Sequence, residues 1–243
     1  GGQLEIVPKM LVFSLPFLCE DRTQAERLVN SEFAREISMD SLKSGATILG
    51  IGDAGGFRQF SNSVRMIRRP EDLKGLKMRS NGMDTINKTL EALGAEVMTV
   101  PYNDLYMALK AGTIDGQENP WVNSSGMRFY EVQKYFTEVN YQFHPEPFYV
   151  NTRWYESLPR EYQEILEECT QEMMKENNRL IDENEVQAME NIRANAEIYT
   201  LSREERQAFV EATQVVYEEY MDNGLLTMDD LARMKRIIRG EEK

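Results

Sequence analysis

Hydrophobic residues in the first quarter of the chain form two dense runs separated by a helical repeat. Met10–Leu18 and Ala46–Gly52 are apolar segments of strand length, bounded by polar residues or glycine. Short and nearly continuous apolar runs are typical of strands that are buried on both faces. We therefore expect both segments to be buried strands, joined by a helix in which apolar side chains recur at Ala25, Leu28, Val29 and Phe33.

The middle of the chain alternates regularly between strand and helix patterns. Leu76–Ser80, Ala95–Val100 and the segment that begins at Ile114 have the length of short strands. Helical spacing fills the two intervals, and Asn81 and Asn103 are suitable N-cap residues for these helices. The order β–α–β–α–β predicts a parallel sheet with right-handed crossovers.

Polar side chains gather where these strands end. The sequence DGQENP at Asp115–Pro120 combines carboxylates and amides, and we interpret it as a turn. Ligands of open α/β sheets bind beyond the carboxyl ends of the strands. Asn119 and its neighbours are therefore the first candidates for a small-molecule site.

A glycine pair marks another irregular segment. Gly55-Gly56 permits unusual backbone angles, so we expect Phe57, Arg58 and Phe60 in a loop or at the start of a strand. The segment lacks the lysine and serine spacing of a phosphate-binding loop, and the chain has no GxGxxG sequence.

The second half of the chain is dominated by helical patterns. Phe129–Phe136 has helical spacing, whereas Glu138–Tyr141 and Phe148–Val150 have the features of strands. Residues 160–223 contain no glycine or proline and keep roughly a helical period, which predicts a helix much longer than the globular mean of about 11–12 residues. Ser202–Glu205 has the capping-box pattern of a further helix.

Composition narrows the range of partners. The chain has 243 residues, 41% of them hydrophobic, which is enough for one large or two small domains. The formal net charge of −13 argues against nucleic-acid binding and against attachment to membranes through basic residues. An anionic ligand would have to be held by local arginines, which act over a Debye length of roughly 8 Å at physiological salt.

Cysteine and histidine provide little chemistry. Cys19 and Cys169 are too isolated for a disulfide scaffold or a zinc site, and we interpret both as small buried apolar groups. His144 is the only histidine, and we interpret it as a structural or surface residue rather than a ligand. The sequence therefore predicts no metal and no cofactor.

Four blocks of the sequence carry a resemblance to one family. In chain order they are LPFL at Leu15–Leu18, PEDLKGLKMR at Pro70–Arg79, DGQENP at Asp115–Pro120 and FYEVQKYF at Phe129–Phe136. Together they resemble the extracytoplasmic solute-binding subunit of tripartite ATP-independent periplasmic (TRAP) transporters, the DctP family. The resemblance extends from about Leu15 to the C-terminal helices.

The resemblance implies an α/β, two-lobed, periplasmic-binding-protein-like fold with a long helix bracing both lobes. Residues 1–55 would form part of lobe I and residues 56–141 lobe II. Residues 142–184 would return to lobe I and include the long helix, and residues 185–243 would place C-terminal helices on lobe II. Family members begin with β–α–β units after an export signal, so we expect a chain truncated at its N-terminus, without one wall of the ligand site.

The resemblance also assigns roles to polar residues. Arg79 matches the carboxylate-binding arginine of the family, and a planar guanidinium offers two parallel donors to a carboxylate. Asn119 would add an amide hydrogen bond to the same ligand. Arg58 matches a second arginine that many members use on the ligand. A solvated or turn-capping role remains the alternative for each.

Three aromatic residues complete the expected ligand site. Tyr102 matches an aromatic pocket position of the family, and Trp121 and Tyr141 would lie at the edges of the site. An ordinary core or interface role is an equal alternative for all three. Stacking on aromatic rings slightly favours the ring of a sugar acid.

We therefore expect a non-enzymatic, monomeric periplasmic or extracytoplasmic receptor. It would capture a small organic acid, either a sugar acid or a C4-dicarboxylate, and deliver it to the membrane permease subunits of a TRAP transporter. One alternative is a sensor subunit that uses the same cleft to signal to a membrane partner. Another is a small α/β enzyme with Asp115 or Glu118 as the acid or base, although a turn-capping role for Asp115 is favoured.

Overall fold

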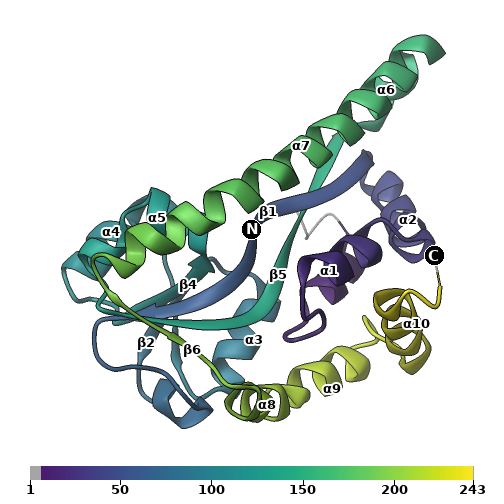
Figure 1. Ribbon diagram of the computed structural model, residues 1–243. Coiled ribbons are helices and arrows are strands. Elements are labelled where there is room, and N and C mark those ends of the chain that lie inside the picture. Colours follow the sequence, from purple (N-terminus) through teal and green to yellow (C-terminus); the bar gives the residue numbers. More distant parts are fainter. Residues whose placement is uncertain (1–6, 243) are drawn as a thin grey trace.

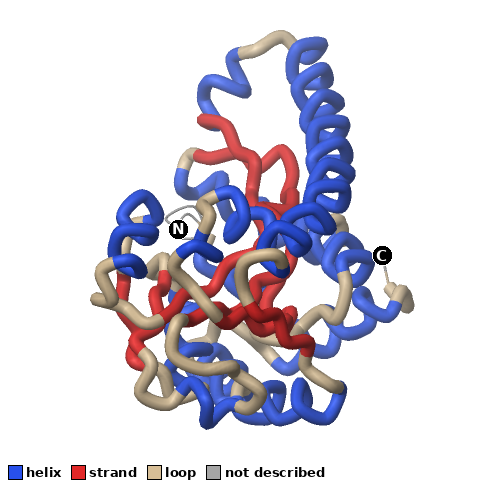
Figure 2. Tube along the Cα trace, turned by 60° about the vertical axis from the view of Figure 1, so that its left-hand side comes forward, coloured by secondary structure: helices blue, strands red, loops and turns tan. Residues whose placement is uncertain are grey.

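The computed structural model describes residues 7–242 as a mixed α/β fold around one sheet (Figure 1). The order of strands across the sheet is β3-β2-β4-β1-β5-β6. Helices pack on both sides of the sheet, and the view in Figure 2 shows the longest helix running beside its narrow end. The strands are β1 (Ala46–Asn62), β2 (Lys77–Ser80), β3 (Glu96–Thr99), β4 (Gly116–Pro120), β5 (Tyr135–Asn151) and β6 (Glu197–Thr200).

Two long antiparallel strands form the axis of the sheet. β1 and β5 each have 17 residues and pair from Ala46 opposite Asn151 to Asn62 opposite Tyr135. β4 joins β1 only along 58–62, and β6 joins β5 only along 135–138. Within the described residues, the other half of β1 and β5 is a two-stranded ribbon, which Figure 1 shows rising beside the long helix.

The parallel part of the sheet confirms the predicted β–α–β–α–β order. β2 pairs in parallel with both β3 and β4. α3 (Asp84–Ala92) connects β2 to β3, and α4 (Tyr102–Lys110) connects β3 to β4. This arrangement brings the carboxyl ends of β2 and β4 to one edge of the sheet, where the sequence predicted the site.

The prediction of a buried strand at Met10–Leu18 is wrong. Pro8–Ser14 forms a 3₁₀ helix, η2, with proline in its first turn. Met10, Val12 and Phe13 are buried in the main core. A short apolar run fits a buried helical turn as well as a strand, and periodicity alone cannot separate the two. The helices that follow are α1 (Arg22–Val29) and α2 (Glu32–Ser38), with a 3₁₀ turn η3 (Met39–Ser44).

Two predicted irregular segments belong to strands. β1 continues through Gly55 and Gly56, whose φ angles are 120° and 93°, with a shift of register between Asp53 and Phe57. The amides of both glycines donate to the Asp53 carboxylate, so the irregularity is a bulge fixed by a side chain. DGQENP is likewise not a turn, because Gly116–Pro120 is β4, paired on both sides.

The helix predicted at Phe129–Phe136 is also replaced. A single 3₁₀ turn, η5 (Phe129–Glu131), is followed by the start of β5 at Tyr135. Phe129 and Phe136 are both buried in a second apolar cluster. Their burial therefore does not require a continuous helix between them.

The long helix is confirmed. α7 (Arg160–Arg193) has 34 residues, begins directly after Pro159 and packs against β1 and α5 (Trp121–Gly126). The capping box predicted at Ser202–Glu205 is present at the start of α8. The remaining elements are α6 (Thr152–Ser157), α8 (Arg203–Ala212), α9 (Gln214–Asp222), α10 (Met228–Arg239) and the 3₁₀ turn η4 (Pro70–Leu73).

Two apolar clusters support this architecture. The larger joins η2, α1, α3 and the C-terminal helices to the sheet. The smaller joins α4, α5 and the end of α7 around Trp121 and Phe136. In the described part of the chain, no helix is both long and apolar enough to cross a membrane.

Candidate ligand site between strands β1, β2 and β4

Buried charge is concentrated beside the predicted site. Four charged side chains of residues 7–242 are almost inaccessible to solvent: Asp53, Arg58, Arg79 and Glu118. Asp53 forms an ion pair with Arg22 at 3.0 Å beside the bulge of β1. The other three come from β1, β2 and β4, which are neighbours in the sheet. A buried charge is costly unless it is paired, so the partners of these three decide what the site can do.

Each guanidinium nitrogen of Arg58 has a partner within the protein. Its Nε and Nη2 donate to the two carboxylate oxygens of Glu118, the second at 2.8 Å. Nη2 also reaches the Asn119 side-chain oxygen at 3.4 Å, and Nη1 lies 2.8 Å from Nδ1 of His144. This two-point ion pair fixes the plane of the guanidinium.

Glu118 is the centre of this polar cluster. Besides Arg58, it accepts a hydrogen bond of 2.5 Å from the hydroxyl of Tyr141, and both residues are fully buried. Burial, and then the charge of Glu118, raise the pKa of Tyr141 well above its usual value. Burial, and then the charge of Arg58, lower the pKa of His144 well below its usual value. Tyr141 and His144 are therefore both neutral near pH 7.

Arg79 has a different environment. It stands in β2 opposite Gln117 of β4 and is 2% exposed. Its Nε donates to the backbone oxygen of Val100 at 2.9 Å, and its guanidinium carbon lies 5.9 Å from the centre of the Tyr102 ring. Burial lowers the pKa of Arg79, Glu118 opposes this effect, and Arg58 adds to it. Among the ion pairs of the described residues, none includes Arg79.

Asn119 is held by a chain of amides. Its Nδ2 donates to the side-chain oxygen of Gln117, whose own Nε2 donates to the hydroxyl of Ser61 at 2.7 Å. Its Oδ1 faces Arg58. The side chain is therefore oriented from two neighbouring strands, and it is 3% exposed.

The three predicted aromatic residues have different environments. Tyr102 is half-buried, meets Phe129 edge-on at 6.3 Å between ring centres, and has its pKa raised by burial. Tyr141 stacks on Phe60 with ring centres 5.0 Å apart. Trp121 is 1% exposed and stacks on Phe136 within the smaller apolar cluster.

The structure thus brings Arg58, Asn119 and Tyr141 together with Glu118, and it places Tyr102 beside Arg79 on the neighbouring strand β2. Trp121 packs in the core. Contact with a ligand remains a prediction for all six.

The sequence did not reveal the role of Glu118 as the partner of Arg58. The sequence pattern indicates only a possible acid or base role for Glu118 and a structural or surface role for His144. Pairing β1 with β4 would have exposed the connection, because Arg58 lies opposite Pro120, two residues from Glu118 on the same face of β4. Asp115 has the structural role that was favoured, since its carboxylate accepts from the Lys77 amide at 2.8 Å.

The cysteine prediction is half right. Cys19 is buried, and burial raises the pKa of its thiol to about 12. Cys169 is exposed on α7 instead of buried, because its position falls on the solvent-facing side of the long helix. In the described part of the chain, no group of histidine, cysteine and acidic residues is arranged to hold a metal ion.

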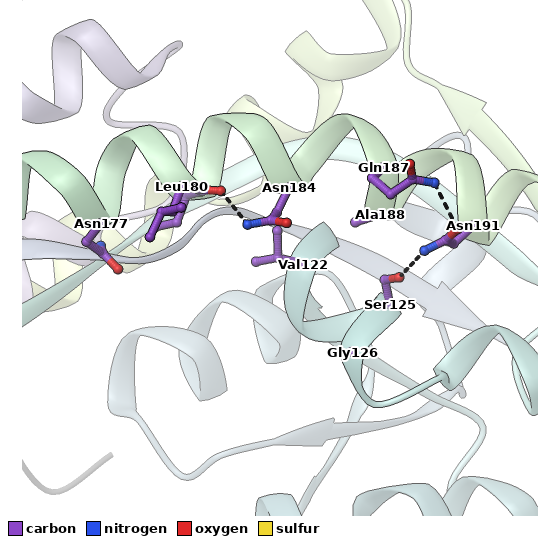
Figure 3. A pocket seen from close by; sticks show the side chains of 10 residues that line it. Val122, Ser125, Gly126, Asn177, Leu180, Asn184, Gln187, Ala188 and Asn191 are labelled. Atoms are coloured by element: carbon purple, nitrogen blue, oxygen red, sulfur yellow. Dashed lines mark hydrogen bonds between the residues drawn. The ribbon is translucent and has the colours of Figure 1, made fainter.

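A separate cavity of about 420 Å³ lies between α5 and α7 (Figure 3). Amide side chains of α7 line one side, where Asn191 donates to the Ser125 hydroxyl of α5 at 3.3 Å. Asn184 donates to the Leu180 backbone oxygen one turn earlier. The residues that line this cavity include none of the six predicted site residues.

Comparison with known proteins gives a consistent family. The model of the DctP family, described as bacterial extracellular solute-binding protein, family 7, matches residues 3–223. The C4-dicarboxylate-binding periplasmic protein DctP of Vibrio cholerae is 31% identical over 216 residues, covering 87% of this chain and 64% of that protein. The 2,3-diketo-L-gulonate-binding periplasmic protein YiaO of Escherichia coli is 26% identical, covering 84% of this chain and 62% of that protein. The chain thus spans less than two thirds of the length of these relatives.

Solved structures share the fold. A TRAP periplasmic solute-binding protein of Ralstonia eutropha, solved with (S)-2-acetolactate bound, has a TM-score of 0.91 and 31% identity, covering 98% of this chain and 77% of that chain. One from Sulfitobacter, with β-D-galacturonate bound, has a TM-score of 0.89 and 26% identity, covering 99% and 78%. One from Shewanella oneidensis, with succinate bound, has a TM-score of 0.91 and 26% identity, covering 98% and 77%. These neighbours are solute-binding proteins, not enzymes, and their likeness confirms the predicted fold class.

Proposed function

Because this chain belongs to the DctP family of bacterial extracellular solute-binding proteins, we propose that it captures a small organic acid through an ion pair with Arg79. One observation carries the proposal. Arg79 is a buried arginine without an acidic partner in the described part of the chain, whereas the three other buried charges are paired.

Physical chemistry favours a carboxylate as the partner of Arg79. A buried cation without a counter-charge carries an uncompensated desolvation cost, and a carboxylate supplies the opposite charge together with two oxygens in the plane of the guanidinium. Hydrogen bonds to charged groups contribute about 1.5–3 kcal/mol each, so the ion pair can dominate the affinity.

Neighbouring groups would hold the rest of the ligand. Asn119 uses one N–H on Gln117 and has a second to offer, and its orientation is already fixed by the sheet. The half-buried ring of Tyr102 lies beside Arg79 and can cover an apolar face of the ligand. Arg58 would contribute through its remaining Nη1 hydrogen. The acids bound by the solved relatives, which include acetolactate, galacturonate and succinate, support this ligand class.

Transport is the role that this family supports best. We infer a monomeric receptor in the periplasm whose two lobes close on the ligand about the long strands β1 and β5, and which then delivers it to a TRAP permease. The lobes would comprise residues 1–55 with 142–184, and 56–141 with 185–243. An enzymatic role is less well supported, because Glu118 is committed to Arg58 and Asp115 to the Lys77 amide.

A thermal-shift screen tests the proposal. The chain is heated with C4-dicarboxylates, uronates, aldonates and keto-acids, and a ligand that binds only the folded state raises the melting temperature by mass action. We expect at least one acid to stabilise the chain, and Arg79→Ala to abolish that shift. Arg69→Ala is the matched control, because the Arg69 side chain is 72% exposed and lies outside the site. An acid that stabilises the Arg79→Ala variant as much as the parent would refute the role of Arg79.

A further inference from the structure

We propose that Asp53 is a positioning residue for the ligand site, because it holds a bulge in β1 that aligns the two halves of the polar cluster around Glu118. One half, Arg58 and Glu118, stands on β1 and β4, and the other half, Tyr141 and His144, stands on β5. The part of this inference that concerns the ligand rests on the proposed function. The alignment itself is a property of the ligand-free chain and can be measured there.

The bulge lies in β1 shortly before Arg58. Three residues of β1, 54–56, face one residue of β5, His144, so β1 has two residues more than its partner strand. Arg58 lies opposite Gln142, whereas the register before the bulge, continued without it, would place Arg58 opposite Asn140. The difference of two residues is about 7 Å along the strand. It therefore decides whether Nη1 of Arg58 reaches the His144 ring, which it contacts at 2.8 Å.

The same register aligns Glu118 with Tyr141. In the sheet β1 separates β4 from β5, so the Glu118 carboxylate meets the Tyr141 hydroxyl, at 2.5 Å, only in the register that β1 keeps against β5. Both residues are fully buried, and a buried carboxylate that loses a donor is destabilised until another donor replaces it. Arg79 could supply that donor, since burial lowers its pKa and the charge of Glu118 opposes this effect. A misaligned Glu118 would therefore compete with the ligand for Arg79.

Asp53 holds the bulge through its backbone amides. Oδ1 of Asp53 accepts hydrogen bonds from the amides of Gly55 at 2.9 Å and Gly56 at 2.5 Å. The φ angles of these glycines, 120° and 93°, are ones that other residues rarely adopt. A Cβ at Gly55 would collide with the Asn123 side chain of α5, so the bulge also fits closely against the helix that follows β4.

Two helices hold the Asp53 side chain and its backbone in place. Oδ2 of Asp53 pairs with Nη1 of Arg22 from α1 at 3.0 Å, and Asn177 of α7 donates to the Asp53 backbone oxygen at 2.8 Å. Burial raises the pKa of Asp53, and the bulge amides and Arg22 oppose this effect. Arg22 also meets Asp182 and Glu185 of α7, at 3.1 and 3.6 Å. The bulge is therefore held between α1 and α7, and the contacts converge on Asp53.

The single histidine of the chain is the probe of the alignment. The NMR signals of the His144 ring are recorded at pH 7.5 in the ligand-free protein. Asp53→Ala removes the acceptor of both amides, so we expect the His144 signals to move. Asp53→Asn keeps an Oδ1 acceptor, and Arg22 retains Asp182 and Glu185, so the signals should stay at their parental positions.

Binding of an acid measures the consequence for the ligand. With the acid that gives the largest thermal shift, isothermal titration should show an affinity roughly tenfold lower in Asp53→Ala and close to the parental value in Asp53→Asn. Tyr220→Phe is the matched control, because it removes a hydrogen bond of 2.9 Å from α9 to Asp84 of α3 and leaves the bulge untouched. It should change neither the His144 signals nor the affinity. The same changes in this control would mean that lost stability alone causes them, and would overturn the proposal.

The outcomes separate this inference from the proposed function. If no acid of the thermal screen binds the parent, the proposed function fails, and the His144 signals still test the alignment. If acids bind but Asp53→Ala keeps the parental His144 signals or the parental affinity, the proposed function stands and the positioning role is overturned. Displaced His144 signals in Asp53→Asn would overturn it as well.

A second variant covers the case in which Asp53→Ala does not fold. Gly56→Ala places a side chain at a φ of 93°, and the nearest neighbour of its Cβ would be the flexible end of Arg22 at 3.1 Å. The strain acts on the bulge while Asp53 stays intact, so the His144 signals should move as in Asp53→Ala. Parental signals in a folded Gly56→Ala would overturn the role of the bulge. Asp53→Asn, which we expect to fold, decides the role of the acceptor in every case.

Discussion

Two buried arginines, one strand apart in the sheet, have opposite environments. Arg58 of β1 has all three guanidinium nitrogens engaged by Glu118, Asn119 and His144. Within residues 7–242, Arg79 of β2 donates one hydrogen bond, from Nε to the backbone oxygen of Val100, and lies over the ring of Tyr102. The solvent exposure of the two residues differs by one percentage point, 1% against 2%.

The difference teaches that burial alone does not identify a ligand-binding arginine. A buried arginine that forms an ion pair with a carboxylate supports the fold, because its removal leaves a buried carboxylate without a counter-charge. A buried arginine without an ion pair destabilises the ligand-free fold. It gains a favourable interaction when an anion binds beside it. On this basis we propose a mainly structural role for Arg58 and a mainly ligand-binding role for Arg79.

The largest expected effect is on the Arg58 side. Glu118→Ala leaves a guanidinium buried without its counter-charge, so the free energy of unfolding should fall by about 3–5 kcal/mol. Urea denaturation measures the change. Glu164→Ala is the control, since Glu164 forms an exposed pair within α7, where a loss of at most about 0.5 kcal/mol is expected. Equal losses in the two variants would show that the buried pair does not stabilise the fold.

The next effect is on the Arg79 side and concerns affinity. Arg79→Ala should cost about 1.5–3 kcal/mol of binding free energy, which is roughly tenfold or more in Kd. Arg79→Lys should recover only part of this loss, because an ammonium group lacks the planar fork that meets two oxygens. Titration calorimetry with the best acid of the screen gives the three constants. Full recovery by lysine would mean that charge alone matters, without two-point contact.

The smallest expected effect is on the Arg58 side and is a change of the free energy of unfolding with pH. The pKa of His144 is lowered in the folded protein by burial and by Arg58, whereas the unfolded value is about 6.5. The unfolded chain therefore takes up the proton first, so stability is full above pH 6.5 and falls as the pH falls below it. Between pH 7.5 and 5.5 this group should lower the free energy of unfolding by at most about 1.4 kcal/mol.

His144→Asn removes the titrating ring and keeps an acceptor for Arg58. Between the two pH values the variant should lose less stability than the parent, by at most about 1.4 kcal/mol, as measured by urea denaturation. The chain has a single histidine, so no other imidazole contributes. A parent and variant with parallel pH profiles would show that His144 is protonated equally in both states.

Local patterns predicted the parts of the fold that depend on local physics. The β–α–β–α–β order, the long helix α7 and the capping box at Ser202 follow from periodicity and capping chemistry within short windows. The run at Met10–Leu18 was mistaken for a strand, because its burial comes from packing of a 3₁₀ turn against distant elements.

The candidate site could be predicted only in part, for the same reason. Arg79 and Asn119 stand near strand ends, which a local pattern can locate. The pairing of Arg58 with Glu118 joins residues 60 positions apart and depends on the register between β1 and β4. Trp121 lies two positions after Asn119, yet its ring packs into the core, because α5 begins at Trp121 and directs the ring onto Phe136.

The most direct test of the account is the response of the arginine side chains to a bound acid. In an NMR titration with the acid that gives the largest thermal shift, the Nε–H signals of Arg79 and Arg58 are followed, after assignment through Arg79→Lys and Arg58→Lys. The account predicts that the Arg79 signal moves most and saturates with the dissociation constant measured by calorimetry. An acid that stabilises the chain while the Arg79 signal stays in place and another arginine responds would contradict it.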